Sequence, residues 1–243
     1  IYAQRYGRTT VVDDVRVAAD RVVVIPGGVD VHRFSAAVVN PRRVRREFRL
    51  PAKARVIGTV GVRDWKGWKE VLQALPEVRA EHPEARLLLV GCESERQQRA
   101  VLRLADEMGL ADGVTPTLTR ADMPDVLAAC DVVVDASWAG TGTTGTIREA
   151  MSLGRAVIAT AIAGNGELVE DGVTGILVPP RDVKTLAAAL RRLPCRQVEA
   201  GHCAPSWLGV ARQGIGEFTG VLGLALVGGD EPLPCDLGAR AGE

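Results

Sequence analysis

This sequence lacks an excess of charge of either sign, a long apolar run and any paired cysteine motif. Its 243 residues include 30 Lys plus Arg and 30 Asp plus Glu, so no overall basic field favours nucleic acid as a partner. No apolar segment approaches the roughly 20 residues of a membrane helix, and no charged-then-apolar signal segment opens the chain. We therefore expect a cytoplasmic protein, at most bound at the membrane surface in a longer form.

The five cysteines are an odd number, and none lies in a Cys-x-x-Cys pair. Cys92 and Cys130 adjoin apolar runs, which predicts reduced and buried thiols. The remaining candidates for zinc ligands lie near the end of the chain: Cys195, His202, Cys203 and Cys235. Their spacing matches no common zinc pattern, so we expect no metal site.

A local basic run covers residues 42–46. It could bind phosphate or a membrane. However, Val44 within the run and Phe48 just after it are one helical turn apart, which is the spacing of an apolar helix face. We interpret the run as the solvated face of a short helix.

Apolar runs of strand length alternate with amphipathic segments of helix length along most of the chain. The candidate strands are residues 21–25, 55–61, 86–91, 114–118, 131–136, 156–160 and 175–178. The candidate helices include apolar faces within residues 68–78, 101–108 and 186–190. Continuously apolar strands separated by helices predict a parallel sheet covered on both faces. The fold class is therefore α/β, a doubly wound Rossmann-like sheet that binds its ligand at the carboxyl ends of the strands.

A glycine-threonine loop follows one of these strands and leads into a helix. It has the form Gly-x-Gly-x-x-Gly, and its candidate ligand-binding residues are Gly140, Gly142, Thr143, Thr144 and Gly145. Such a loop directs backbone N–H groups and the positive end of the helix dipole at one point. The sequence therefore predicts a phosphate or diphosphate site there.

The same pattern also occurs in dinucleotide-binding proteins and opens a rival hypothesis, an NAD(P)-binding oxidoreductase domain. That class requires an acidic residue at the end of the next strand to hold the adenosine ribose. The next strand ends at Thr160, Ala161 and Ile162, none of which is acidic. This hypothesis is therefore the less favoured one.

Six short sequence motifs follow one another along the chain. They lie at residues 25–34, 61–67, 87–91, 129–131, 149–159 and 164–180. Together they resemble the C-terminal, nucleotide-sugar-binding domain of a retaining family-four glycosyltransferase with the GT-B fold. The resemblance covers residues 22–193 and implies transfer of a hexose or similar sugar from a nucleoside diphosphate, with retention of configuration.

The chemistry of such a donor requires fixed positive groups, because charge grows on the diphosphate as the sugar–phosphate bond breaks. Arg63 and Lys66 follow the strand that ends at Gly61 and are the candidate catalytic residues. The resemblance implies that Glu149 holds the ribose hydroxyls. Glu167 either meets the sugar or caps a helix.

One position departs from the family pattern. The family carries two Glu residues, and the earlier of them falls on Thr141 in this sequence. A threonine cannot act as a charged partner to an oxocarbenium-like transition state. A non-catalytic nucleotide-binding fragment therefore stays open as an alternative.

The resemblance implies that residues 1–20 are a remnant of an N-terminal domain or a linker and that residues 21–194 are the donor-binding domain. Residues 195–243 are rich in glycine and show no sustained periodicity, so we expect an atypical, poorly ordered tail there. The chain begins at Ile1 rather than Met, and we interpret it as a fragment without its N-terminal domain. None of His32, His82 and His202 lies where the family's catalytic His would be. We expect the chain alone to be inactive, to need no cofactor, and to work with an acceptor that is a glycan, a lipid-linked sugar or a small molecule.

Overall fold

The computed structural model describes residues 18, 21–22, 28–140, 144–162 and 164–192. Their core is a six-stranded sheet in the order β3-β2-β1-β4-β5-β6, with every pairing parallel. The strands are β1 (Arg55–Val60), β2 (Ala85–Cys92), β3 (Val114–Leu118), β4 (Val132–Asp135), β5 (Ala156–Thr160) and β6 (Ile176–Val178). The predicted doubly wound α/β fold is confirmed.

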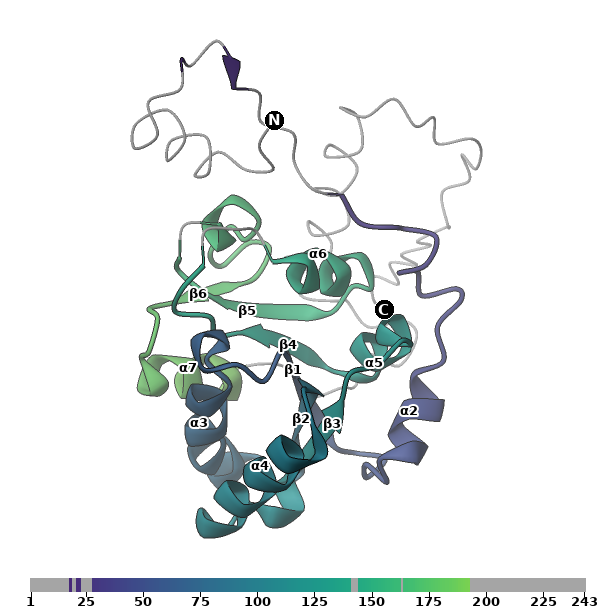
Figure 1. Ribbon diagram of the computed structural model, residues 1–243, viewed down its shortest axis with the longest axis vertical. Helices are drawn as coiled ribbons and strands as arrows, with labels where there is room; N and C mark the ends of the chain where they lie inside the picture. The colour runs from purple at the N-terminus through teal and green to yellow at the C-terminus, as the bar shows by residue number, and fades with distance from the viewer. Residues whose placement is uncertain (1–17, 19–20, 23–27, 141–143, 163, 193–243) are drawn as a thin grey trace, which may run out of the picture.

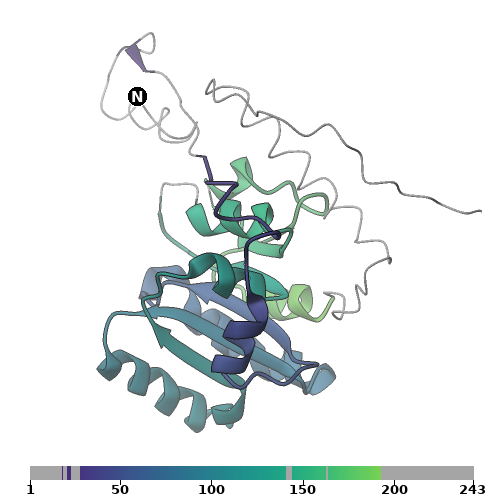
Figure 2. The same ribbon diagram turned by 90° about the vertical axis from the view of Figure 1, so that its right-hand side faces the viewer.

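Helices cover both faces of the sheet (Figures 1 and 2). The α-helices are α2 (Pro41–Glu47), α3 (Trp68–Glu81), α4 (Glu95–Glu107), α5 (Met123–Ala129), α6 (Gly145–Ser152) and α7 (Val183–Arg191). The short 3-10 helices are η3 (Asp64–Lys66), η4 (Ala111–Gly113) and η5 (Asn165–Glu167). Core residues of α3, α4 and α7 form one hydrophobic cluster with the sheet, and those of α2, α5 and α6 form the other.

The strands divide their side chains between these two layers. In β1, Val56 packs with the α2, α5 and α6 layer, whereas Ile57 packs with α3, α4 and α7. Leu87 and Leu88 of β2 divide in the same way. Successive residues of a strand point to opposite faces, so a strand buried on both faces must be apolar throughout. This explains why the strands are continuous apolar runs in the sequence.

Side-chain caps mark where several helices begin. Asn40 accepts a hydrogen bond from the backbone N–H of Arg43 at the start of α2, and Asp182 accepts one from Thr185 at the start of α7. Ser94 does the same for Gln97 in α4, over 3.3 Å. Each cap satisfies a backbone donor that has no partner within the first turn.

Six of the seven predicted strands are present, within a residue or so of their predicted ends. The exception is residues 21–25, where Arg21 lies in a 3-10 turn and Val22 in no strand. Residues 23–25 lie outside the described residues, as do the predicted tail at 195–243 and nearly all of the predicted segment 1–20.

The basic run at residues 42–46 forms the expected short helix, α2, but the interpretation of its arginines as solvated is wrong for Arg45. That side chain is only 10% exposed and pairs with Asp131 at 2.8 Å. Its other nitrogens donate to the carbonyl oxygens of Ala54 and Ala129. Burial is possible because three fixed acceptors replace the water that the guanidinium gives up.

The described cysteines agree with the prediction for them, since Cys92 and Cys130 are free and buried. Burial raises the pKa of the Cys130 thiol to about 12, which makes it a poor nucleophile and metal ligand. The four zinc candidates of the tail lie outside the described residues.

In the part of the chain that the structure describes, no group of three or more His, Cys, Asp or Glu residues could hold a metal ion. That part also contains no helix long and apolar enough to cross a membrane.

Candidate functional site

The candidate site lies at the carboxyl edge of the sheet, between β1 and β4. The chain runs outward from β1 through β2 to β3, and then returns to place β4 on the other side of β1. The loops that follow β1 and β4 therefore leave the sheet side by side. In open α/β sheets, this reversal of strand order is where ligands bind.

The loop after β1 carries Gly61, Arg63 and Lys66. Gly61 has a φ of +92°, and a Cβ atom at this position would lie 3.3 Å from Cγ of Lys66. A residue with a side chain would be strained at this φ and would crowd the lysine stem. Glycine at this position thus lets Lys66 fold back over the end of β1.

Lys66 lies close to a buried carboxylate at the end of β4. Its Nζ atom is 3.7 Å from Oδ2 of Asp135, whose side chain is 5% exposed. The same Nζ lies 4.7 Å from the centre of the Trp65 ring, within the range of a cation–π contact. Oδ1 of Asp135 accepts the N–H of Ser137. Lys66 is therefore a cation with a defined position rather than a freely moving surface side chain.

Hydrogen bonds and a close backbone approach connect the loops that follow β1 and β4. The backbone N–H of Trp138 donates to the carbonyl oxygen of Trp65 at 3.0 Å, and its indole Nε1 donates to the carbonyl oxygen of Asp64 at 2.9 Å. Gly67 has a φ of +69°, and a Cβ there would collide with the carbonyl group of Ala136. The two loops therefore hold each other in place.

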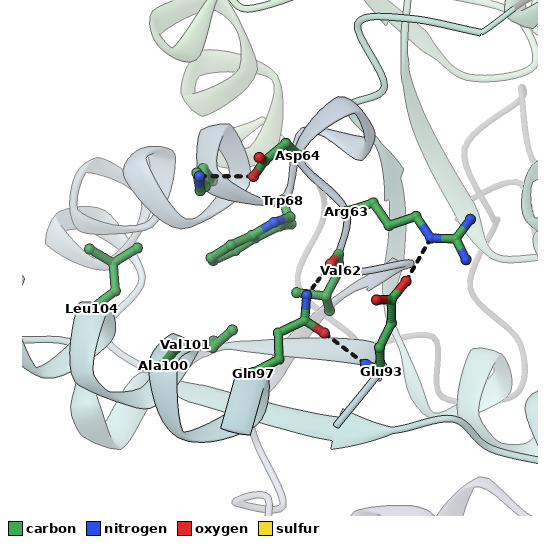
Figure 3. Close-up of a pocket in the computed structure, with 10 residues that line it drawn as sticks. Val62, Arg63, Asp64, Trp68, Glu93, Gln97, Ala100, Val101 and Leu104 are labelled. Carbon is green, nitrogen blue, oxygen red and sulfur yellow. Dashed lines mark hydrogen bonds and ion pairs between the residues drawn. The ribbon is translucent and has the colours of Figure 1, made fainter. Parts of the chain in front are cut away.

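Arg63 lies on the β2 side of the same edge (Figure 3). Its side chain is 61% exposed, and its Nε atom is 3.0 Å from Oε1 of Glu93. A cavity of about 520 Å³ opens next to it between α3 and α4. Trp68, Val101 and Leu104 are among the residues that line this cavity.

The glycine-threonine loop is described only at its ends. Gly140, with a φ of +122°, lies beside Trp65, since a Cβ on it would be 3.7 Å from the indole. Thr144 is the N-cap residue of α6, and Gly145 is the first residue of that helix. Gly142 and Thr143 lie outside the described residues, as does Thr141.

Glu149 lies in α6, one turn after the helix begins, and is partly buried. Burial raises the pKa of its carboxyl group, while the nearby positive charges of Arg148 and Arg33 oppose this shift. Its Oε1 atom is 3.9 Å from the position of a Cβ on Gly145. The carboxylate therefore points back towards the start of the helix.

A buried hydrogen-bond chain supports the start of α6. Asn165 is fully buried and donates to the carbonyl oxygen of Thr160 at 3.1 Å. The Thr160 hydroxyl donates in turn to the carbonyl oxygen of Ser137, and Thr144 Oγ1 donates to Asn165 Oδ1 at 3.5 Å. Glu167 closes η5 beside this chain and is partly buried.

The structure thus brings Gly61, Lys66 and Gly140 together at the ends of β1 and β4. Arg63 flanks them on the β2 side, and Glu149 lies in the helix that follows the β4 loop. Sequence reasoning missed Asp135 and Gln97. Gln97 has a recognisable signal, because Ser94 and Gln97 form the Ser-x-x-Gln pattern of a capping box.

Comparison with known proteins identifies the family of this chain. The profile of the family described as "Glycosyl transferases group 1" matches residues 54–194, more than half of the chain. The chain belongs to this family. Group 1 relatives include a D-inositol 3-phosphate glycosyltransferase of Corynebacterium jeikeium, 32% identical over 200 residues, which cover 75% of this chain and 46% of that protein. A 2-deoxystreptamine glucosyltransferase of Streptomyces kanamyceticus is 33% identical over 182 residues, which cover 72% of this chain and 46% of that protein.

Solved glycosyltransferase structures share the fold. HepE of Anabaena, in complex with UDP and glucose, superposes with a TM-score of 0.74 at 26% identity, covering 89% of this chain and 57% of that one. A glycosyltransferase of Rickettsia africae gives a TM-score of 0.79 at 21% identity, covering 88% of this chain and 57% of that one. The chain spans less than half the length of the two curated relatives. All described site residues from Gly61 to Glu167 lie within the segment that matches the group 1 profile.

Proposed function

We propose that this chain is the donor-binding half of a retaining glycosyltransferase with the GT-B fold, which transfers a sugar from a nucleoside diphosphate. The observation that carries the proposal is the convergence of Lys66, Gly61 and Gly140 at the reversal of strand order, with Arg63 beside them. Membership of the glycosyltransferase family supports the reaction class.

In this proposal, Arg63 and Lys66 bind the diphosphate and stabilise the charge that develops on it as the sugar leaves. The guanidinium of Arg63 uses Nε for Glu93, and its terminal nitrogens can form the two parallel bonds that suit phosphate oxygens. Lys66 supplies a point charge at the start of α3. The donors at the start of α6 complete the site.

Glu149 holds the ribose. Burial makes the charged form of this carboxylate costly, and hydrogen bonds from two ribose hydroxyls replace the water it has lost. Glu167, on the following loop, approaches the sugar.

Sugar transfer lacks one expected group, because position 141, where the family resemblance implies a carboxylate, is a threonine. A chain that binds the nucleotide without transferring sugar is therefore the second candidate function. The two candidates share the nucleotide site and differ only in turnover.

The proposed enzyme needs a second domain to close the cleft, and this chain alone is expected to be inactive. Its acceptor is a glycan, a lipid-linked sugar or a small molecule. The names of the two relatives make D-inositol 3-phosphate and 2-deoxystreptamine the first small acceptors to test. Because Arg63 and Lys66 can neutralise the diphosphate, we propose that neither a metal ion nor another cofactor takes part.

Calorimetric titration of the purified chain with UDP, GDP, ADP and NAD, without added metal, tests the proposal. UDP comes first because HepE was solved with it. Binding of one nucleoside diphosphate but not NAD is the expected result, and it also identifies the base. Binding of NAD alone, or of none of the four, would contradict the proposal.

A further inference from the structure

Gln97 connects the two loops that flank Arg63, and both of its polar side-chain atoms are used to do so. Its Nε2 atom donates to the carbonyl oxygen of Val62 at 2.6 Å. Its Oε1 atom accepts the backbone N–H of Glu93 at 2.7 Å. Figure 3 shows the side chain lying between the two loops, at the edge of the cavity. One side chain thus links the loop after β1 to the loop after β2.

Both links lead to Arg63. Val62 precedes Arg63 in the chain, so the first bond fixes the backbone from which the arginine extends. Glu93 accepts a hydrogen bond from Nε of Arg63 at 3.0 Å, so the second bond fixes the backbone of the residue that pairs with the guanidinium. Gln97 therefore acts on both the backbone and the side chain of Arg63 without touching it.

A glycine with positive φ lies at or next to the end of each of the two strands that precede these loops. Gly61 and Gly91 both have a φ of +92°, and a Cβ on Gly91 would lie 3.6 Å from the backbone nitrogen of Gly61. Glycine restricts the backbone less than any other residue. The ion pair between Arg63 and Glu93 is exposed on both sides, and exposed pairs restrain side chains weakly. The bonds of Gln97, a partly buried residue at the start of α4, are the stronger restraint.

We infer that Gln97 is a positioning residue, which sets Arg63 in the place where it binds the diphosphate of the donor. The inference rests on the proposed function. It assigns to Gln97, a residue of the first turn of α4, a part in donor binding.

The test is a double-mutant cycle in the full 243-residue chain, with UDP as the probe and GDP or ADP if UDP does not bind. Gln97→Met keeps the length of the side chain and removes both hydrogen bonds. Gln98→Met is the matched control, because Gln98 lies next to Gln97 in α4 and makes one bond of similar length, 2.7 Å, to the carbonyl oxygen of Pro116 in β3. Each variant is made with Arg63 intact and with Arg63→Ala, and the thermal midpoint of each is recorded.

We expect Gln97→Met to weaken nucleotide binding about five- to tenfold, the loss that corresponds to one hydrogen bond of ordinary net strength. In the Arg63→Ala background the same change should have no further effect, because the residue that it positions is absent. Gln98→Met should leave affinity within about twofold of the parent in both backgrounds.

An equal loss in both backgrounds, or no loss in either, would overturn the inference. If Gln97→Met does not fold, Gln97→Asn serves instead, since it keeps an uncharged amide that is one methylene too short to bridge Val62 and Glu93; its loss should also depend on Arg63. A different result would contradict the proposed function itself: Arg63→Ala, Lys66→Ala and Glu149→Ala would all leave the affinity for the nucleotide unchanged.

Discussion

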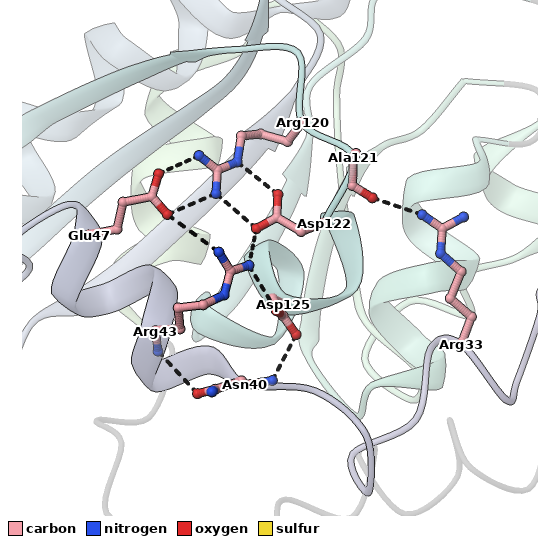
Figure 4. Close-up of polar contacts among 8 residues, drawn as sticks. All are labelled: Arg33, Asn40, Arg43, Glu47, Arg120, Ala121, Asp122 and Asp125. Carbon is pink, nitrogen blue, oxygen red and sulfur yellow. Dashed lines mark hydrogen bonds and ion pairs between the residues drawn. The ribbon is translucent and has the colours of Figure 1, made fainter.

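Two groups of cations in this chain differ in how completely their charges are paired. The first, which we term the α2 junction, links α2 to α5 (Figure 4). It also links α2 to the segments that precede and follow α5. Its cations are Arg43, Arg45 and Arg120, and their carboxylate partners are Glu47, Asp122, Asp125 and Asp131. Figure 4 draws all of these except Arg45 and Asp131. The second consists of Arg63 and Lys66 at the carboxyl edge of the sheet.

In the α2 junction, each of two arginines binds more than one carboxylate. Arg120 lies 2.8 Å from Asp122 and also bonds to Glu47, and Arg43 bonds to Asp122 and Asp125. These hydrogen bonds lower the pKa of Asp122 to about 2 and raise the pKa of Arg43 and Arg120. The charges of this region are saturated by one another, so we assign it a structural role.

At the edge of the sheet, pairing is sparse. Among the ion pairs of the described residues, Lys66 has one, at 3.7 Å, and Arg63 has one, with an exposed partner. Cations that keep unused donors are the ones able to bind an anion. The comparison teaches that pairing, rather than the presence of arginine or lysine, separates structural cations from candidate ligand-binding ones. Mutations in both groups test this distinction, through their effects on stability and on nucleotide affinity.

The largest effect is expected at the buried pair of the α2 junction. Arg45→Ala should lower the free energy of unfolding by about 3–5 kcal/mol, because it breaks a buried ion pair with Asp131 and removes the guanidinium bonds to the carbonyl oxygens of Ala54 and Ala129. Nucleotide affinity should not change as long as the chain is folded. Chemical denaturation gives the stability, and Arg46→Ala, an exposed neighbour in α2, should cost no more than about 0.5 kcal/mol. Equal losses for the two variants would show that burial of Arg45 is unimportant.

The second prediction concerns Lys66. Lys66→Ala should weaken nucleotide binding by at least about tenfold, or about 1.4 kcal/mol, because a charged contact to the diphosphate is lost. Stability should also fall, because the buried Asp135 carboxylate loses its nearby cation, so the thermal midpoint is recorded first and affinity is compared at a temperature where both variants are folded. Lys53→Ala is the control, because this exposed lysine lies just before β1, at the opposite edge of the sheet from the proposed site. Titration of both variants with the same nucleotide decides whether sparse pairing marks the binding cation.

The sequence was sufficient to predict the sheet, because continuous apolar runs in β1 to β6 allow few other structures. Gly61, Arg63 and Lys66 could be named as candidates because they follow a predicted strand, and the structure places Gly61 and Lys66 in contact at its end. Asp135 could not, since the pattern presents it only as the polar end of β4, and its contact with Lys66 depends on how two loops pack. Arg45 was misinterpreted for a related reason, since its acceptors lie 9 to 86 residues away in the sequence.

The third prediction tests the α2 junction through pH. The pKa of Asp122 is lowered in the folded protein, so its contribution to stability is full above the ordinary aspartate pKa of roughly 4 and is lost as the pH falls towards 2. Asp122→Asn should therefore cost about 1 kcal/mol at pH 7 and close to nothing near pH 2. Unfolding curves across this range measure the difference, with Asp106→Asn in exposed α4 as control. A difference that does not depend on pH would contradict a role for the carboxylate charge.

The smallest effect is expected at Glu149, and it has the opposite sign. Burial raises the pKa of this carboxyl group, so the folded state disfavours its charged form, and stability is lost as the pH rises through its pKa. Glu149→Gln should therefore raise the thermal midpoint at pH 7.5 by on the order of 1 °C, and the gain should shrink as the pH is lowered towards 4.5. Nucleotide binding should weaken at the same time, because the acceptor proposed for the ribose hydroxyls loses its charge. Glu107→Gln, at the exposed end of α4, should change neither quantity. A variant that loses stability while keeping its affinity would place Glu149 with the structural charges of the α2 junction, whereas gained stability with lost affinity is the signature of a residue retained for binding.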